Sequence, residues 1–434
     1  MLEKLFGFDP KVHSVKTEIV AGLTTFLTMA YILAVNPGIF SALADKGMPT
    51  GAVFTATALA AIVGTVIMAI YAKKPFALAP GMGLNAYFVY TICLTLGYTW
   101  QFALTAILIE GLIFIALTLS SVREAIANSI PLTLKRAIAA GIGLFIAFIG
   151  MKNAGIVVDN PATLVGLGKL SNPSALLAIA GFVFTAVLVT MKVKGALLYG
   201  ILAVTLAGIP FGITKLDGIA SVPPSIEPIF MQFEYSQIFT GDMWVAVMTF
   251  LFIDLFDTIG TVVGVSMKSG MIDSHGRIPG LNKTLMADAI ATVAGACFGT
   301  STTTTYVESA SGVAAGGRTG LTAFTVAVCF LISIFFAPLF LAVPAAATAP
   351  ALMLVGLFMM ATFDGVDFNN FAESIPAFVC LIAMPLTYSI ANGIMLGIIS
   401  YTAINALTGK VKNISPVMWA LTVVFIGYYI IVWA

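Results

Sequence analysis

Long apolar runs, separated by short polar segments, dominate the chain. A helix that crosses a membrane needs roughly 20 predominantly apolar residues. Uninterrupted apolar runs occupy residues 19–40, 51–71, 99–120, 136–153, 174–191, 195–213, 243–266, 283–298, 321–342, 349–362, 376–390 and 391–408. Two more segments, 75–97 and 299–317, are apolar but interrupted by Gly, Pro and Thr. The pattern predicts an all-α polytopic membrane protein with fourteen transmembrane segments and a further apolar stretch at 416–434.

The composition excludes a soluble protein. Apolar residues make up 60% of the 434 residues and charged residues only 9%, whereas soluble domains carry about 25% charged residues. The net charge of +1 gives no reason to expect a nucleic-acid partner. The 4 cysteines lie in apolar stretches without CxxC spacing, and 2 histidines make a His-based metal site an unfavoured interpretation. We therefore expect no metal and no organic cofactor.

Lysine and arginine residues are distributed unevenly between alternate loops of this topology. Cytoplasmic loops collect Lys and Arg. With the N-terminus inside, sixteen of the 20 basic residues face the cytoplasm, and four lie outside, namely Lys46, Lys152, Lys169 and Lys215. If either interrupted segment failed to cross, every later loop would change sides and the bias would be lost. The asymmetry predicts a cytoplasmic N-terminus, and the short loops and termini favour a bacterial cytoplasmic (inner) membrane.

Short matches indicate that the second half of the chain repeats the first. The tripeptide TFL occurs at 25–27 and 249–251, and GLF at 143–145 and 356–358. The interrupted segments align at a similar offset. Seven spans per half is an odd number, so the second half must insert upside down, a recurrent transporter design. The predicted organisation is a first repeat at 1–213, an extracellular-side linker loop at 214–240, a second, inverted repeat at 241–408 and a C-terminal hydrophobic segment at 409–434.

The interrupted segments predict short extended stretches followed by half-helices. Pro80 and Gly81 cannot continue a helix comfortably, and the threonine-rich run 300–306 favours extended structure. Bare backbone at membrane depth must be satisfied by protein or water, so we expect two short midplane strands, one from each half, to pair. The half-helices that start near Asn85 and Glu308 would then point their N–H groups at the centre. The alternative is a pair of re-entrant loops with only a structural role.

Acidic residues inside the apolar runs are the main candidate functional groups. Asp254 and Asp257 are spaced i, i+3 and share a helix face. A carboxylate at the bilayer centre costs around 3 kcal/mol on insertion scales, so it usually faces a cavity. Glu308 begins the second half-helix, and Asp288 lies in the run 283–298. Their alternatives are structural: helix capping or pairing for Asp254, Asp257 and Glu308, and an even balance between proton relay and support for Asp288.

Polar residues without charge complete the candidate set. Asn85 offers a donor and an acceptor, with a helix-start cap as its alternative. Thr28 and Tyr31 share a face of the first span, and core packing is the favoured alternative for both. The only nearby base is Arg318, beyond the second half-helix. A neutral ligand with several N–H donors therefore suits Glu308 and Asp257, and carboxylates at this depth supply a means of proton coupling.

Two motifs, DTIG at 257–260 and TTYVES at 304–309, resemble those of the nucleobase–ascorbate (nucleobase:cation symporter 2) transporters. The stretches TTFLTMAY at 24–31 and APGMGLNA at 79–86 are similar to the AzgA-like branch of purine permeases in that family. The resemblance covers nearly the whole chain. The chain departs from the uracil and xanthine branches by an Asp in place of Glu in the first motif and by the additional carboxylate of Asp254.

The resemblance implies a fold, a substrate class and site residues. It implies seven-plus-seven inverted repeats, a core domain from about 19–120 and 243–342, a gate domain from about 136–213 and 349–408, and a homodimer. Asp257 and Glu308 would bind a purine base, and backbone near Asn85 and Ser309 would contribute. Thr28 would line the same cavity, and Phe256 or Tyr87 would stack on the ring. Proton coupling would involve Asp254, Asp257, Asp288 and Glu308. The implied activity is proton-coupled import of hypoxanthine, guanine or adenine, without catalysis.

Two other functions remain as alternatives. An anion transporter or exchanger on the same fold would need a substrate-facing base near the half-helices, and none is present in the sequence there. An intramembrane hydrolase would need two carboxylates sharing a proton across two helices. Asp254 and Asp257 lie on one predicted helix, and no GxGD signature occurs.

Overall fold

The computed structural model describes residues 2–120, 130–268, 271 and 278–433. The chain forms two compact units, one from Met1–Leu119 with Gly150–Ala351 and the other from Ser120–Ile149 with Leu352–Ala434. Arg123 and Arg277, which belong to the predicted cytoplasmic set, lie outside the described residues.

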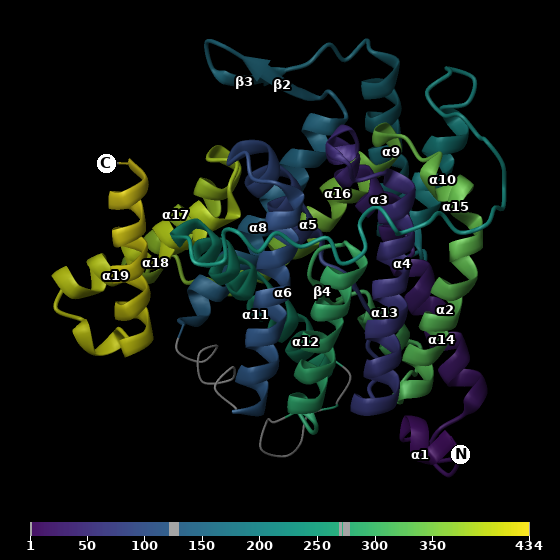
Figure 1. Ribbon diagram of the computed structural model, residues 1–434, viewed down its shortest axis with the longest axis horizontal. Helices are drawn as coiled ribbons and strands as arrows, with labels where there is room; N and C mark the ends of the chain where they lie inside the picture. The colour runs from purple at the N-terminus through teal and green to yellow at the C-terminus, as the bar shows by residue number, and fades with distance from the viewer. Residues whose placement is uncertain (1, 121–129, 269–270, 272–277, 434) are drawn as a thin grey trace. The chain divides into compact units, whose positions relative to one another are not determined.

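The first unit is built from helices and two small strand pairs (Figure 1). Its helices are α1 (Leu2–Phe6), α2 (Val15–Met29), α3 (Ile32–Phe40), α4 (Thr50–Ile67), α5 (Met82–Ala86), α6 (Trp100–Leu119), α9 (Pro173–Thr190), α10 (Ala196–Ala207), α11 (Gly241–Lys268), α12 (Leu281–Phe298), α13 (Ser309–Ala314), α14 (Gly320–Ser333) and α15 (Ala337–Leu341). A π-helical stretch, Tyr87–Thr95, continues α5. The strands are β1 (Leu78–Pro80), β2 (Val157–Asn160), β3 (Leu164–Leu167) and β4 (Thr303–Thr305).

The second unit is helical among its described residues. It contains α17 (Phe371–Leu386), α18 (Ile390–Leu407) and α19 (Pro416–Trp433). Two helices, α8 (Leu132–Asn153) and α16 (Ala345–Met360), contribute residues to both units. Within the second unit α8 and α16 approach closely, because a Cβ added at Gly143 would lie 2.6 Å from the Gly356 carbonyl oxygen. Small residues are typical of such helix contacts in membranes.

Helix ends follow local sequence signals. Thr319 precedes α14, and its side chain accepts a hydrogen bond from the Leu321 N–H at 3.2 Å. Asn172 caps α9 in the same way, with Pro173 at the first helical position. These residue types satisfy the free N–H groups of a first turn.

Eight helical segments in the described part are long and apolar enough to cross a membrane, so the chain is a multi-pass membrane protein. They are Val15–Lys46, Thr50–Ala72, Trp100–Leu119, Leu132–Asn153, Pro173–Thr190, Gly320–Leu341, Ala345–Gly365 and Ile390–Leu407. Shorter apolar helices, including Met82–Thr95 and Phe371–Leu386, fall where further spans were expected. The count of fourteen and the inverted repeat stay predictions.

The first span, expected at 19–40, lies within one helical segment, Val15–Lys46. A tightened turn at Ala30 and Tyr31 separates α2 from α3 within it. At this turn, Leu33 N donates to Ala30 O at 3.1 Å and Ala34 N to Tyr31 O at 3.0 Å. These i to i+3 bonds tighten the turn, and they place Tyr31 where the two helices meet.

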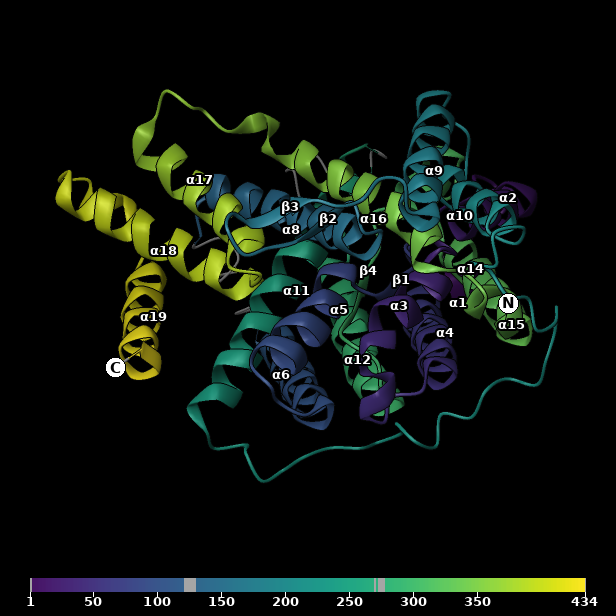
Figure 2. The same cartoon turned by 90° about the horizontal axis from the view of Figure 1, so that it is seen from above.

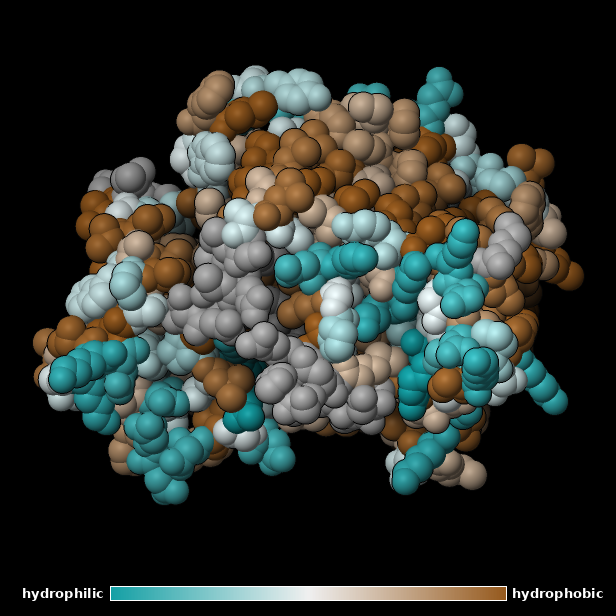
Figure 3. Space-filling view, turned by 90° about the horizontal axis from the view of Figure 1, so that it is seen from below, coloured by the Kyte–Doolittle hydropathy of each residue, from teal (hydrophilic) through white to brown (hydrophobic). Residues whose placement is uncertain are grey.

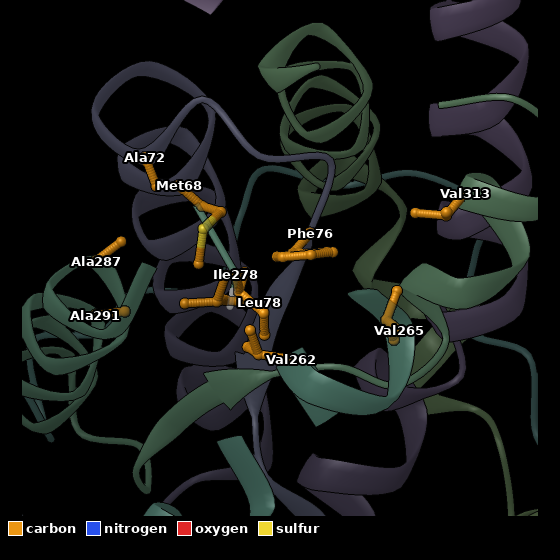
Figure 4. Packing of buried hydrophobic residues seen from close by; sticks show 10 residues of the cluster. All are labelled: Met68, Ala72, Phe76, Leu78, Val262, Val265, Ile278, Ala287, Ala291 and Val313. Carbon is orange, nitrogen blue, oxygen red and sulfur yellow. The ribbon is translucent and has the colours of Figure 1, made fainter. Parts of the chain in front are cut away.

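An apolar cluster packs around β1 and includes Leu78 of that strand (Figure 4). Met68, Phe76 and Leu78 pack with Val262 of α11 and Ala291 of α12. All five side chains are fully buried. Close packing of this kind, rather than transfer from water, holds helices together inside a bilayer. The cluster therefore fixes the position of the first strand relative to α11 and α12.

Much of the surface in Figure 3 is coloured as hydrophobic. Large apolar side chains on the helices are exposed, including Leu112, Leu176 and Leu331 at 52%, 53% and 50%. Exposed apolar faces of this extent would be unfavourable in water and match a lipid-facing surface.

Candidate functional site

The strands β1 and β4, one from each interrupted segment, form an antiparallel pair inside the first unit (Figure 2). The register pairs Leu78 with Thr305, Ala79 with Thr304 and Pro80 with Thr303. Gly81 N donates to Thr302 O at 3.0 Å, and Tyr306 N donates to Ala77 O at 2.9 Å, so the ladder continues beyond both ends. The expectation that the two interrupted segments pair through short strands is confirmed.

Side chains from neighbouring helices complete the hydrogen bonding of the strands. Thr65 Oγ1 on α4 accepts from Leu78 N at 2.9 Å. Asp288 Oδ1 on α12 accepts from Thr305 N at 3.1 Å. Buried backbone groups need such partners because water does not reach them. Side chains of α4 and α12 therefore accept the backbone N–H groups of Leu78 and Thr305, which lie opposite each other in the pair.

The first half-helix begins earlier than the sequence indicates. Gly81 is extended, at φ −71° and ψ 129°, and α5 starts at Met82. Asn85 N donates to Gly81 O at 2.8 Å, so Asn85 lies inside the helix and the helix-start interpretation is wrong. Its Oδ1 accepts a hydrogen bond from the Ser301 hydroxyl. The Asn85 side chain thus joins the two interrupted segments, and its role in binding a substrate stays a prediction.

Glu308 lies at the start of α13 and is half-buried. Its Oε1 accepts a hydrogen bond from the Tyr31 hydroxyl at 2.5 Å. Thr28, one turn before Tyr31, places its Oγ1 2.9 Å from Ser311 Oγ. The structure therefore brings Thr28 and Glu308 into one region, with Tyr31 between the first span and the carboxylate.

Ser309 has both of its polar groups engaged. Its Oγ accepts from Ala77 N at 3.0 Å, and its own N–H donates to Tyr306 O at 3.1 Å. The residue joins α13 to the first interrupted segment. Direct contact with a substrate stays a prediction for Ser309.

Asp257 approaches the strand pair from α11. Its Oδ2 would lie 3.7 Å from a Cβ placed on Gly81, and the side chain is half-buried. The side chain of Phe256, expected to stack on the ligand, lies outside the described part. Tyr87, the other stacking candidate, packs edge-on against Phe250 with ring centroids 4.9 Å apart.

The other acidic residues of α11 and α12 meet at one hydroxyl. Thr258 Oγ1 lies 3.0 Å from Asp254 Oδ1, 3.0 Å from Asp288 Oδ1 and 2.6 Å from Thr304 Oγ1. Asp254 and Asp288 are both fully buried. The two carboxyl groups are thus linked to each other and to β4, on the buried side of α11.

Sequence reasoning missed two buried carboxyl groups, Glu18 on α2 and Glu110 on α6. Glu110 on α6 is 0% exposed, and its Oε2 accepts from Thr302 Oγ1 at 2.8 Å. The signal was present, because Glu110 interrupts the apolar run 99–120 and an acid at membrane depth is a functional candidate. Tyr31 gave a weaker signal, since an aromatic residue in an apolar run is usually part of the core.

The arrangement favours a ligand that donates hydrogen bonds. Asp257 and Glu308 present acceptor oxygens, whereas the Arg318 guanidinium donates to Val313 O and Gly317 O at 2.6 and 2.8 Å. Among the described residues, no group of three or more His, Cys, Asp or Glu is placed to hold a metal ion.

Known permeases match the chain over nearly its whole length. A protein of Methanocaldococcus jannaschii described as a permease is 48% identical, over 98% of this chain and 97% of that one. The guanine/hypoxanthine permease PbuG of Bacillus subtilis is 44% identical, over 99% of each chain. The adenine permease AdeQ of Escherichia coli is 42% identical, over 95% of this chain and 93% of that one.

A solved structure and a family model agree with these relatives. The transmembrane domain of the cyanobacterial bicarbonate transporter BicA has a similar fold, with a TM-score of 0.65 at 16% identity, over 87% of this chain and 97% of that one. A permease family model, Xan_ur_permease, matches residues 16–396. The sequence motifs, the paired strands and these matches together place the chain in the nucleobase–ascorbate permease family.

Proposed function

We propose that the protein imports a purine nucleobase, namely hypoxanthine, guanine or adenine, through the site beside the strand pair. The position of Glu308 and Asp257 carries the proposal. Both are half-buried carboxyl groups next to the two interrupted segments. Ring N–H groups of a purine would donate to them, and a neutral heterocycle avoids the repulsion that an anion would meet. Relatives named as guanine/hypoxanthine and adenine permeases support this substrate class.

Proton coupling is the second part of the proposal. Thr258 has one hydroxyl proton, yet its Oγ1 lies 3.0 Å from an oxygen of each of two buried aspartates. Hydrogen bonds to both at once need a further proton on Asp254 or Asp288. We assign the coupling proton to the set Asp254, Asp257, Asp288 and Glu308, with H+ as the coupling ion.

The proposed architecture completes the transport model. Fourteen spans in two inverted repeats of seven would place the strand pair near the bilayer midplane, as in related transporter designs. Core and gate domains would move relative to each other during alternating access. We further propose a homodimer in the bacterial cytoplasmic membrane, with the N-terminus inside.

Anion transport is the alternative that the BicA-like fold raises. At 16% identity the likeness concerns the fold alone. The carboxyl groups of the site would repel an anionic ligand. The Arg318 guanidinium donates to main-chain carbonyl groups instead of facing the site as a free base.

Uptake assays test the substrate class directly. Labelled hypoxanthine, guanine, adenine, xanthine and uracil are offered to cells that lack their own base permeases, with and without a protonophore. We expect saturable uptake of one or more purines that the protonophore abolishes. If no base enters, the substrate proposal fails, and labelled bicarbonate and sulfate are the next substrates to test.

Glu308→Gln tests the binding carboxylate. The amide presents an NH₂ donor in place of one acceptor oxygen, so an N–H of the ligand loses its partner. An unpaired buried donor costs about 1–3 kcal/mol, which corresponds to roughly a 5- to 150-fold loss of uptake efficiency at low substrate. Glu227→Gln, at an exposed loop position, is the matched control. Normal uptake by Glu308→Gln would remove this residue from the site.

A further inference from the structure

One face of α2 runs along the second interrupted segment in the opposite chain direction. Positions three or four residues apart lie on one helix face. On α2 and the turn after it, these positions are Glu18, Ala21, Thr25, Thr28 and Tyr31. Glu18 contacts Arg318 and Thr319, and Ala21 lies against Gly312 and Gly317. Thr25 also lies against Gly312, Thr28 contacts Ser311, and Tyr31 contacts Glu308. The second half-helix is therefore docked on the first span along its whole length.

The contact is anchored at its far end by a buried carboxyl group. Glu18 is 1% exposed, and it accepts hydrogen bonds from Arg318 N at 3.0 Å and Thr319 N at 3.2 Å. In the middle, a Cβ added to Gly312 would lie 2.6 Å from Ala21 O. These contacts prevent α2 from sliding along the second half-helix, so they fix the position of the last residue of the face relative to α13.

That last residue is Tyr31. It is 0% exposed and lies at the junction of α2 and α3. Its hydroxyl donates to Glu308 Oε1 at 2.5 Å, across 277 residues of sequence. Because hydrogen bonds are directional, this one orients the carboxyl group as well as stabilising it. Among the described side chains, Tyr31 supplies the one hydrogen bond that Glu308 Oε1 receives.

We propose that Tyr31 is a positioning residue of the substrate site, which orients the Glu308 carboxyl group so that its acceptor meets one ring N–H of the base. The inference rests on the proposed function, because it assumes that the ligand donates to Glu308. Tyr31 itself need not touch the ligand. Its effect should then appear only for ligands that carry the donor in question.

Inhibition constants for two kinds of ligand separate positioning from general damage. Unlabelled hypoxanthine and its ring-N-methylated derivatives are used as competitors of the uptake of a labelled purine. Each methylated derivative lacks one N–H that hypoxanthine has. In the unaltered protein, the derivative that loses most affinity identifies the N–H that meets Glu308. In Tyr31→Phe we expect the parent base to bind about tenfold more weakly and that derivative to bind unchanged, so their ratio falls about tenfold. Tyr429→Phe is the control, because it removes a hydroxyl of α19 that donates to Asn392 Oδ1 of α18 at 3.2 Å. This variant should keep the ratio of the unaltered protein.

The outcomes separate this inference from the proposed function. If the unaltered protein binds no purine, the proposed function fails first. If it discriminates against the methylated derivative and Tyr31→Phe does so equally, the positioning role is wrong. If Tyr31→Phe weakens both ligands equally, Tyr31 is only structural. Should Tyr31→Phe not fold, 3-fluorotyrosine at position 31 retains the hydroxyl and must retain the unaltered ratio within about twofold.

Discussion

At the scale of single residues, Asp288 links the candidate proton network to the backbone of β4. Its Oδ1 accepts from Thr305 N at 3.1 Å and lies 3.0 Å from Thr258 Oγ1. The sequence left proton relay and structural support evenly balanced for this residue. The geometry gives it a supporting contact, and a relay role remains our proposal.

Asp288→Ala should destabilise the protein measurably. It leaves the buried Thr305 N–H without its acceptor, and such a loss costs about 1–3 kcal/mol. Asp288→Asn keeps an acceptor oxygen and should lie between the alanine variant and the unaltered protein. Thermal unfolding of the purified protein in detergent measures both, with exposed Asp217→Ala as the control. Equal midpoints for all four proteins would show that the Asp288 contact does not support β4.

At the scale of elements, the close approach of α13 to α2 requires a glycine. A Cβ on Gly312 would lie 2.6 Å from Ala21 O and would also collide with Thr25 Oγ1. Backbone cannot yield as the end of a flexible side chain can, so the half-helix would have to move. That movement would carry Glu308 and Ser311 away from their partners on the first span.

Gly312→Ala should therefore impair transport, although alanine has a higher helix propensity than glycine. Overpacking costs about 1–3 kcal/mol, and we expect roughly a tenfold or greater loss of purine uptake at low substrate. Gly38→Ala is the matched control, because nothing lies within 4 Å of the added Cβ in α3. Uptake by Gly312→Ala at the level of Gly38→Ala would contradict the docked arrangement.

At the scale of the whole molecule, the distribution of basic residues makes a topological prediction. With the N-terminus inside, the exposed residues Lys46 and Lys169 face outward, and Lys192 and Lys410 face the cytoplasm. The prediction depends on both interrupted segments crossing the membrane.

Single-cysteine labelling tests this topology. The four native cysteines are replaced, and a cysteine is introduced at 46, 169, 192 or 410. A membrane-impermeant maleimide added to intact cells should label positions 46 and 169, and positions 192 and 410 only after permeabilisation. Labelling of 192 in intact cells would mean that an interrupted segment does not cross, and the fourteen-span count would be wrong.

Part of the site could be predicted from sequence because its signals are local. Pro80, Gly81 and the threonine run mark broken helices through their own backbone preferences. Carboxyl groups in apolar runs mark themselves by the cost of burying them. Tyr31 has no such local signal, because its proposed role depends on a hydrogen bond to Glu308, 277 residues away in the sequence. Asn85 was assigned to a helix start because element boundaries cannot be located within a few residues from a pattern alone.

The sequence by itself determined that this is a multi-pass membrane protein, that two of its apolar segments are interrupted, and that its motifs resemble those of the permease family. Composition and apolar run length decide the first feature, Gly, Pro and Thr residues decide the second, and short motifs carry the third, so each is a property of a short stretch of chain. Only the tertiary structure decided that β1 pairs with β4 in its observed register, that Asp288 holds Thr305 and that Tyr31 donates to Glu308. Those contacts join segments far apart in the chain, and their distances depend on how whole helices pack.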